Sequence, residues 1–221
     1  MADERTLEAV RYLGYGRHAV DERTLALVAD SFKELESCAR LKSVYRIFEC
    51  HFPEHGRIMI GTMNIASKNL AKNLLGCRET AVFGATLGAE VDFLLKKYSL
   101  TDMAKAVVLQ ACAAAYLEEY CDEIQDKLAK EKAKEGQWLR PRFSPGYGDF
   151  DIHHQQEVLR MLDAPKKIGL TMTEGYMLTP TKSVTAVIGI SREKADCHRK
   201  GCEECDKTDC KYRRNERDGA V

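Results

Sequence analysis

The stretch RFSPGYGDF, residues 142–150, carries the most informative pattern in the chain. Pro145 followed by Gly146 indicates a tight turn, because proline presets φ at the second turn position and glycine tolerates the positive φ that a type II turn needs next. The same segment offers the guanidinium of Arg142, backbone amides and the ring of Tyr147. A guanidinium binds carboxylates through two parallel hydrogen bonds. The residues alone leave two interpretations open, a surface turn with an exposed arginine or a turn that binds a ligand.

The segments around and after this turn resemble a known domain. Residues 142–147 fit the pattern R-x-x-x-G-Y, and Thr173-Glu174-Gly175 and PTKSV (residues 180–184) follow it in order. In these motifs the chain resembles the activation (reactivation) domain of cobalamin-dependent methionine synthase, whose S-adenosylmethionine-binding signature is R-x-x-x-G-Y. The resemblance covers about residues 100–191, and the preceding part is similar to stand-alone versions of the domain. Gly175 stands where the family has serine.

Composition indicates a soluble, cytoplasmic protein. The 221 residues allow one or two domains, and 44% hydrophobic with 31% charged residues is ordinary for a globular chain. A formal net charge of zero provides no field that recruits nucleic acid or an anionic membrane. The N-terminus has no apolar signal segment, and no apolar run reaches transmembrane length. Nine cysteines without a secretion signal indicate a reducing compartment rather than a disulfide framework.

Helical and strand patterns are segregated along the chain and predict an α+β fold. Helices are expected at residues 3–13, 21–39, 67–76, 91–98, 101–130 and 152–163, and strands at 44–50, 57–61, 80–87, 169–172 and 184–190. The resemblance implies a twisted antiparallel sheet flanked by helices. We expect residues 1–99 to form the N-terminal helix and strand part of the domain. Residues 100–191 then form its S-adenosylmethionine-binding part, and residues 192–221 form a Cys-rich tail.

Glu118 and Asp122 lie four residues apart, on one face of the longest expected helix. One interpretation is an acidic pair that faces solvent. The resemblance favours another, because acidic side chains on this helix line the ligand site in the fused family. Glu118 is then expected beside the ammonium or sulfonium of the ligand. Ala114 or Ala115 stands where the fused domain has a further glutamate, one turn earlier.

The resemblance also assigns roles to the residues of the turn. Arg142 is expected to clamp the methionine carboxylate, and backbone groups of Phe143, Pro145 and Gly146 are expected to contact the ligand. Tyr147 is expected to pack against the ligand or to hydrogen-bond to it. No residue is expected to act as an acid, a base or a nucleophile, because the task of such a domain is to position a methyl group.

Four cysteines near the C-terminus form the spacing C-x4-C-x2-C-x4-C, at Cys197, Cys202, Cys205 and Cys210. Four thiolates can bind zinc and so order a segment that has no core of its own. The first part of the spacing also fits a plant-type iron–sulfur cluster. A thiol-bearing segment without metal is the third alternative. The other five cysteines lie in apolar segments and are expected to be small buried hydrophobes.

The resemblance implies an S-adenosylmethionine-binding activation protein. Such a protein supports reductive methylation of cob(II)alamin on a separate cobalamin-dependent methionine synthase, with flavodoxin or ferredoxin as reductant. A separate partner is expected because the chain has no room for cobalamin, homocysteine and folate domains. Two alternatives stay open: an activator of another corrinoid methyltransferase that uses the Cys-rich tail for electron transfer, and a non-catalytic S-adenosylmethionine-binding module. Phosphate-loop, dinucleotide-binding and esterase motifs do not occur in the sequence.

Overall fold

The computed structural model describes residues 3–15, 20–53 and 56–194. These residues fall into two compact units. The first unit lies within Met1–Arg40 and Ala89–Tyr120, and the second lies within Leu41–Gly88 and Cys121–Cys197. The second unit takes residues from both sides of residue 100.

The described part of the first unit is helical. It contains α1 (Glu4–Tyr12), α2 (Glu22–Cys38), α4 (Ala89–Thr101) and the first part of α5 (Met103–Ala133). Asp21 accepts a hydrogen bond from the Thr24 amide at 2.8 Å and so caps the start of α2.

The predicted start of the longest helix at Thr101 is wrong. Thr101 is the last residue of α4, and α5 begins at Met103. The Asp102 side chain accepts a hydrogen bond from the Lys105 amide at 3.0 Å. This capping geometry explains why a new helix starts directly after α4.

The second unit is built on a six-stranded sheet with the order β3-β2-β1-β4-β8-β5. Its strands are β1 (Lys42–His51), β2 (Arg57–Ile60), β3 (Met63–Ala66), β4 (Cys77–Thr86), β5 (Trp138–Leu139) and β8 (Ser183–Ser191). Every neighbouring pair of strands is antiparallel. The predicted α+β fold with an antiparallel sheet is therefore confirmed.

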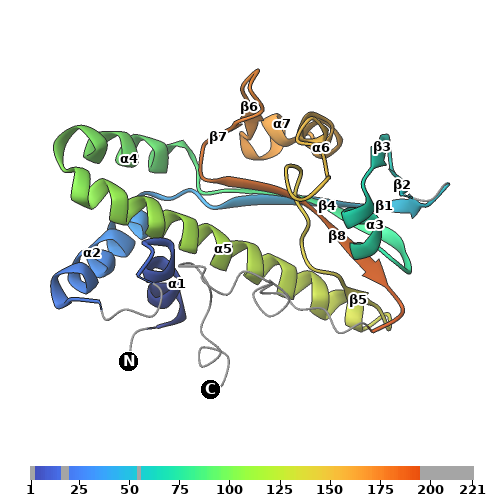
Figure 1. Ribbon diagram of the computed structural model, residues 1–221, viewed down its shortest axis with the longest axis horizontal. Helices are drawn as coiled ribbons and strands as arrows, with labels where there is room; N and C mark the ends of the chain where they lie inside the picture. The colour runs from blue at the N-terminus through green and yellow to red at the C-terminus, as the bar shows by residue number, and fades with distance from the viewer. Residues whose placement is uncertain (1–2, 16–19, 54–55, 195–221) are drawn as a thin grey trace. The chain divides into compact units, whose positions relative to one another are not determined.

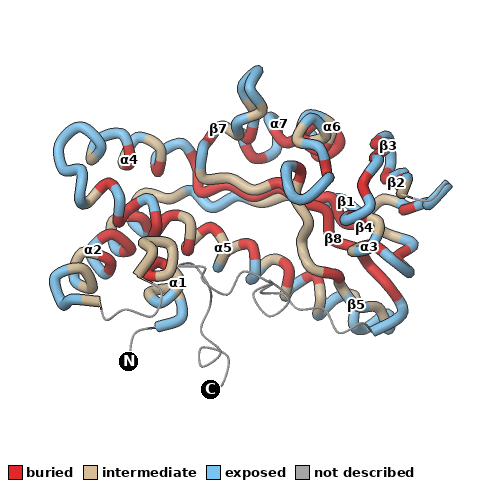
Figure 2. Tube along the Cα trace, in the orientation of Figure 1, coloured by how far each residue is buried: buried red, intermediate tan, exposed pale blue. Residues whose placement is uncertain are grey.

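Two short helices, α6 (His154–Leu162) and α7 (Ala164–Ile168), lie over one face of this sheet (Figure 1). Figure 2 shows that β4 and β8 are buried along most of their length. Val82 and Val187 of these strands belong to the same hydrophobic core as Leu162 and Phe150. A Cβ at Gly84 would lie 3.2 Å from the Leu162 side chain, so α6 packs closely against the strand at this glycine.

Some short elements differ from the prediction. The sequence did not predict β3, β5 or β7 (Leu178–Thr179). The strand expected at residues 169–172 is reduced to β6 (Thr171–Met172), which pairs with β7 in a separate two-stranded sheet. Two-residue strands of this kind are defined by their partners, so their own residues carry little periodicity.

Candidate functional site

The segment that leads into the predicted binding turn runs beside β8. Arg140 donates its backbone N–H to the Gly189 carbonyl at 2.8 Å, and Phe143 exchanges both backbone hydrogen bonds with Val187 at 2.9 Å. Pro141 lies between these contacts and has no N–H to donate. The sheet edge therefore fixes the backbone of Phe143, and both backbone polar groups of this residue are used by the sheet.

The turn itself has the conformation that the sequence predicted. Gly146 has a φ of 91°, and Tyr147 donates its N–H to the Ser144 carbonyl at 3.2 Å across the turn. Gly146 in turn donates its N–H to the Phe150 carbonyl at 2.7 Å. Within the described residues, the amide and hydroxyl of Ser144 have no hydrogen-bond partner. Ser144 thus keeps two donors that the described residues do not use.

Asp149 ties the turn to the start of α3 (Lys68–Asn73). Its carboxylate accepts hydrogen bonds from the Ser67 hydroxyl at 2.5 Å and from the amides of Lys68 at 2.7 Å and Asn69 at 3.1 Å. These bonds, the one from Ser67 first, hold the pKa of Asp149 below its ordinary value. Gly148 has a φ of 55°, which favours glycine, and a Cβ there would lie 2.5 Å from the end of the Asn69 side chain. The sequence analysis missed this anchor.

Phe150 closes the turn on the side of the core. The side chain is only 1% exposed, and its ring lies 6.3 Å from the ring of Phe143 and 5.5 Å from that of His154, between centroids. Tyr147, by contrast, is 71% exposed. The turn therefore has one side packed into the protein and an aromatic ring on its open side.

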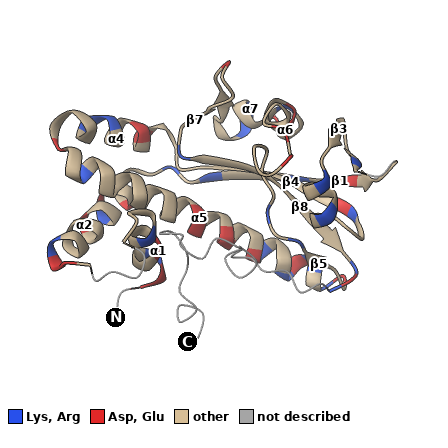
Figure 3. Cartoon of the chain, in the orientation of Figure 1, with Lys and Arg blue, Asp and Glu red and all other residues tan. Residues whose placement is uncertain are grey.

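Arg142 is held by two residues of α5. Its Nη1 lies 2.8 Å from Asp122 Oδ1 and donates a hydrogen bond to Gln125 Oε1 at 3.0 Å. Acidic residues occur repeatedly along this part of the helix (Figure 3). The spacing of Asp122 marked it as a candidate but did not connect it with Arg142, and no sequence pattern indicated Gln125.

Glu118, the other acidic residue singled out from the sequence, belongs to the first unit, while Arg142 belongs to the second. Glu118 is partly exposed and lies one helical turn before Asp122 on α5. Its expected place beside the ligand stays a prediction.

The two later motifs lie in and next to the β6–β7 hairpin. Thr173 accepts the N–H of Tyr176 at 3.0 Å in a turn where Tyr176 has a φ of 61°. The ring of Tyr176 meets the ring of His153 edge-on, with centroids 4.5 Å apart. His153 is paired with Asp151, whose carboxylate also accepts the His153 amide at 2.9 Å directly before α6. The Ser183 hydroxyl donates to the Pro180 carbonyl at 2.6 Å, so this serine stabilises the turn that leads into β8.

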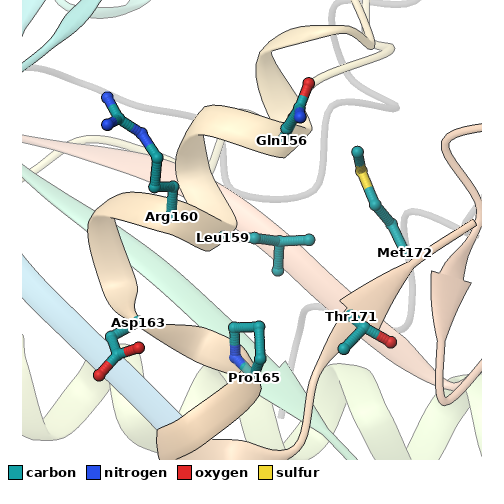
Figure 4. A pocket seen from close by; sticks show the side chains of 7 residues that line it. All are labelled: Gln156, Leu159, Arg160, Asp163, Pro165, Thr171 and Met172. Atoms are coloured by element: carbon teal, nitrogen blue, oxygen red, sulfur yellow. The ribbon is translucent and has the colours of Figure 1, made fainter. Parts of the chain in front are cut away.

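A separate pocket of about 420 Å³ is lined by residues of α6, α7 and β6 (Figure 4). Its apolar part is formed by Leu159, Pro165 and Met172. Arg160 at its rim is already paired with Glu157. None of the turn residues 142–147 lines this pocket, so it is distinct from the predicted site.

The tail cysteines Cys197, Cys202, Cys205 and Cys210, expected as metal ligands, lie outside the described residues, and a metal there stays a prediction. Within the residues that are described, no three His, Cys, Asp or Glu side chains are arranged to hold a metal ion. Burial raises the pKa of the Cys112 thiol to about 12, as expected for a cysteine that serves as a small hydrophobe. No helix in the described part of the chain is long and apolar enough to cross a membrane.

Comparisons with known proteins agree with the motifs. The family model described as vitamin B12 dependent methionine synthase, activation domain, matches residues 71–214. The match therefore extends beyond residues 100–191 on both sides. A crystal structure of the MetH reactivation domain bound to AdoHcy is similar to this chain with a TM-score of 0.58 and 14% sequence identity, covering 87% of this chain and 78% of that one. At this identity the likeness establishes a shared fold. None of the curated proteins compared matches the chain.

Proposed function

Because this chain belongs to the vitamin B12-dependent methionine synthase activation-domain family, we propose that it binds S-adenosylmethionine at the Arg142 turn. The protein then supports reductive methylation of cob(II)alamin carried by a separate methionine synthase. The observation that carries the proposal is the turn that begins at Arg142. It combines a guanidinium, a glycine with positive φ and an exposed tyrosine in the order R-x-x-x-G-Y.

The residues of the turn fit the chemistry of this ligand. A guanidinium forms charge-assisted hydrogen bonds with a carboxylate, and Arg142 is the only arginine within the turn, residues 142–150. Ser144 keeps its amide and hydroxyl available, which suits the polar groups of a nucleoside. The exposed ring of Tyr147 can stack on an adenine or pack against the methionine chain.

The contribution of this chain to the reaction is positional. S-adenosylmethionine supplies a methyl group on a sulfonium; as the partner's cobalt takes up one electron and the methyl group, the sulfonium becomes the thioether of S-adenosylhomocysteine. Arg142 and the turn hold the amino-acid end and the nucleoside, which leaves the methyl group free to face the partner. Holding two reactants in a productive orientation lowers the barrier without acid or base groups. Flavodoxin or ferredoxin is the proposed source of the electron.

Calorimetric titration with S-adenosylmethionine tests the binding site. We expect Arg142→Ala to weaken binding by about tenfold to a hundredfold, since a hydrogen bond to a charged group contributes about 1.5–3 kcal/mol. Arg160→Ala is the matched control. It removes a guanidinium from the second unit that is 67% exposed and paired with Glu157, and we expect it to leave the affinity unchanged. Equal affinity of Arg142→Ala and wild type would remove Arg142 from the site.

Reconstitution tests the role of the partner. The protein is mixed with a cob(II)alamin-carrying methionine synthase that lacks its own activation domain, a reduced flavodoxin and S-adenosylmethionine. We expect recovery of methyltransferase activity that depends on all three additions. Binding of the ligand without recovery would indicate a non-catalytic module, and recovery of a different corrinoid methyltransferase alone would indicate another partner.

A further inference from the structure

Both hydrogens of one guanidinium nitrogen of Arg142 are already in use. Nη1 carries two hydrogens, and it lies 2.8 Å from the Asp122 carboxylate and 3.0 Å from the Gln125 side-chain oxygen. Both distances are within hydrogen-bond range. The two acceptors lie three residues apart on α5, so one face of this helix supplies both.

The two acceptors differ in how easily each could leave. Gln125 is only 5% exposed, and taking its amide oxygen away from Arg142 would leave a buried polar group without this partner. The Asp122 side chain is 59% exposed, so its carboxylate can return to water, whereas the side chain of Arg142 is 15% exposed. An exposed ion pair of this kind shifts an equilibrium by a factor of about five at most. Asp122 is therefore the exchangeable partner and Gln125 the fixed one.

We propose that a ligand binds at Arg142 by exchange of carboxylates. Asp122 leaves the guanidinium, the carboxylate of the incoming ligand takes its place, and Gln125 keeps the guanidinium in position. This inference rests on the proposed function, because it takes the amino-acid carboxylate of S-adenosylmethionine as the incoming group. Asp122 then lowers the affinity for ligands that carry this carboxylate and has no effect on ligands that lack it.

Two nucleosides separate this role from a general one. S-adenosylhomocysteine carries the amino-acid carboxylate, and 5′-methylthioadenosine has the same adenosine and sulfur without the amino-acid part. For Asp122→Asn we expect S-adenosylhomocysteine to bind about two- to fivefold more tightly, the range of an exposed ion pair, with unchanged binding of 5′-methylthioadenosine. Glu123→Gln is the matched control, because it removes the same charge from the neighbouring exposed position of α5.

Gln125 is tested as a positioning residue with the same pair of ligands. For Gln125→Met, which keeps the length of the side chain but removes the acceptor, we expect about tenfold weaker binding of S-adenosylhomocysteine. Binding of 5′-methylthioadenosine should change much less. Gln125→Glu retains an acceptor oxygen but adds a buried carboxylate at the same guanidinium, so it should not restore the affinity. Thermal denaturation of each variant identifies any loss of binding that results from unfolding.

The outcomes distinguish this inference from the proposed function. If wild type binds S-adenosylhomocysteine and Asp122→Asn binds it equally or less tightly, carboxylate exchange is overturned while the proposed function stands. An equal gain in Asp122→Asn and Glu123→Gln also overturns it, since the effect is then one of overall charge. Failure of wild type to bind either nucleoside overturns both.

Discussion

Two arginines of this chain, Arg5 in the first unit and Arg142 in the second, are each held by acidic side chains, but their surroundings differ. The guanidinium of Arg5 lies over the ring of Phe32 at 4.4 Å and over that of Tyr116 at 5.6 Å. It also pairs with Glu36 at 2.7 Å and with Glu119 at 3.4 Å. Arg5 therefore has two rings and two carboxylates around it within its own unit.

Arg142 is instead paired with polar side chains of α5. It is held on Nη1 by an exposed carboxylate and a buried amide, and it stands at the start of a turn that leads to the exposed Tyr147. A guanidinium between aromatic rings gains cation–π and packing energy that depends on the folded state alone. The two side chains are similarly buried, with 22% of Arg5 and 15% of Arg142 exposed, so their partners rather than their burial distinguish them.

The largest expected effect concerns the support beneath the Arg142 turn. Phe150→Ala removes a ring that is 1% exposed from the core of the second unit. We expect the free energy of unfolding to fall by about 3–5 kcal/mol, the usual cost of truncating a buried phenylalanine. Chemical denaturation measures this change. If the free energy of unfolding of Phe150→Ala fell by less than about 1 kcal/mol, the turn would not depend on the core.

Truncation of Arg5 should lower the free energy of unfolding by less, through lost cation–π and ionic contacts instead of a cavity. For Arg5→Ala we expect the free energy of unfolding to fall by about 2 kcal/mol, because the cation–π contacts and the pair with Glu36 are lost together. For Arg142→Ala we expect a loss of about 1 kcal/mol, because the ion pair with the exposed Asp122 contributes little and the main cost is the buried Gln125 oxygen that loses its donor.

Denaturation of both variants, with Arg5→Lys as a control that keeps the charge, checks this order. The comparison between the two arginines fails if Arg142→Ala is the more destabilised of the two. It also fails if Arg5→Lys is as stable as wild type, because charge alone would then account for the role of Arg5.

Much of the fold could be predicted because its elements carry local signals. The Asp21 cap, the turn at Gly146 and the β-branched stretch in β1 depend on neighbouring residues, which a sequence displays directly. The boundary between α4 and α5 was placed wrongly, because Thr101 and Asp102 are both common helix-capping residues and the hydrophobic pattern runs through them. The short strands β3, β5 and β7 depend on partners that are distant in the sequence.

The site was predicted in part for the same reason. The R-x-x-x-G-Y pattern identified the turn, since all its residues lie within one short segment. The hydrogen bonds that hold the turn reach much further, from Asp149 to Ser67 and from Arg142 to Gln125. Nothing in the spacing of these residues signals that the fold brings them together. Glu118 and Asp122 share a helix face by spacing, but spacing does not say which of them meets Arg142.

The smallest expected effect concerns acid and the anchor at Asp149. Its pKa in the folded protein lies below the ordinary value of 3.8, mainly because Ser67 donates to the carboxylate. The stability that this anchor contributes is therefore fully present above about pH 4 and is lost as the pH falls through the lowered pKa. We expect Asp149→Asn to melt at a lower temperature than wild type at pH 7, with the difference shrinking as the pH falls below 4.

Thermal melts from pH 7 to pH 3 measure this difference in melting temperature. Ser67→Ala serves as a second variant, which removes the Ser67 hydroxyl. That variant keeps the carboxylate but loses the main donor and its own cap of α3, so we expect a loss of about 1 kcal/mol at neutral pH, the usual value of an N-cap. The bonds of Asp149 to Ser67 and α3 anchor the turn that begins at Arg142, whereas Arg5 lies in the other unit. Affinity for S-adenosylhomocysteine should therefore fall in both anchor variants, and unchanged affinity would show that Asp149 stabilises α3 without shaping the site.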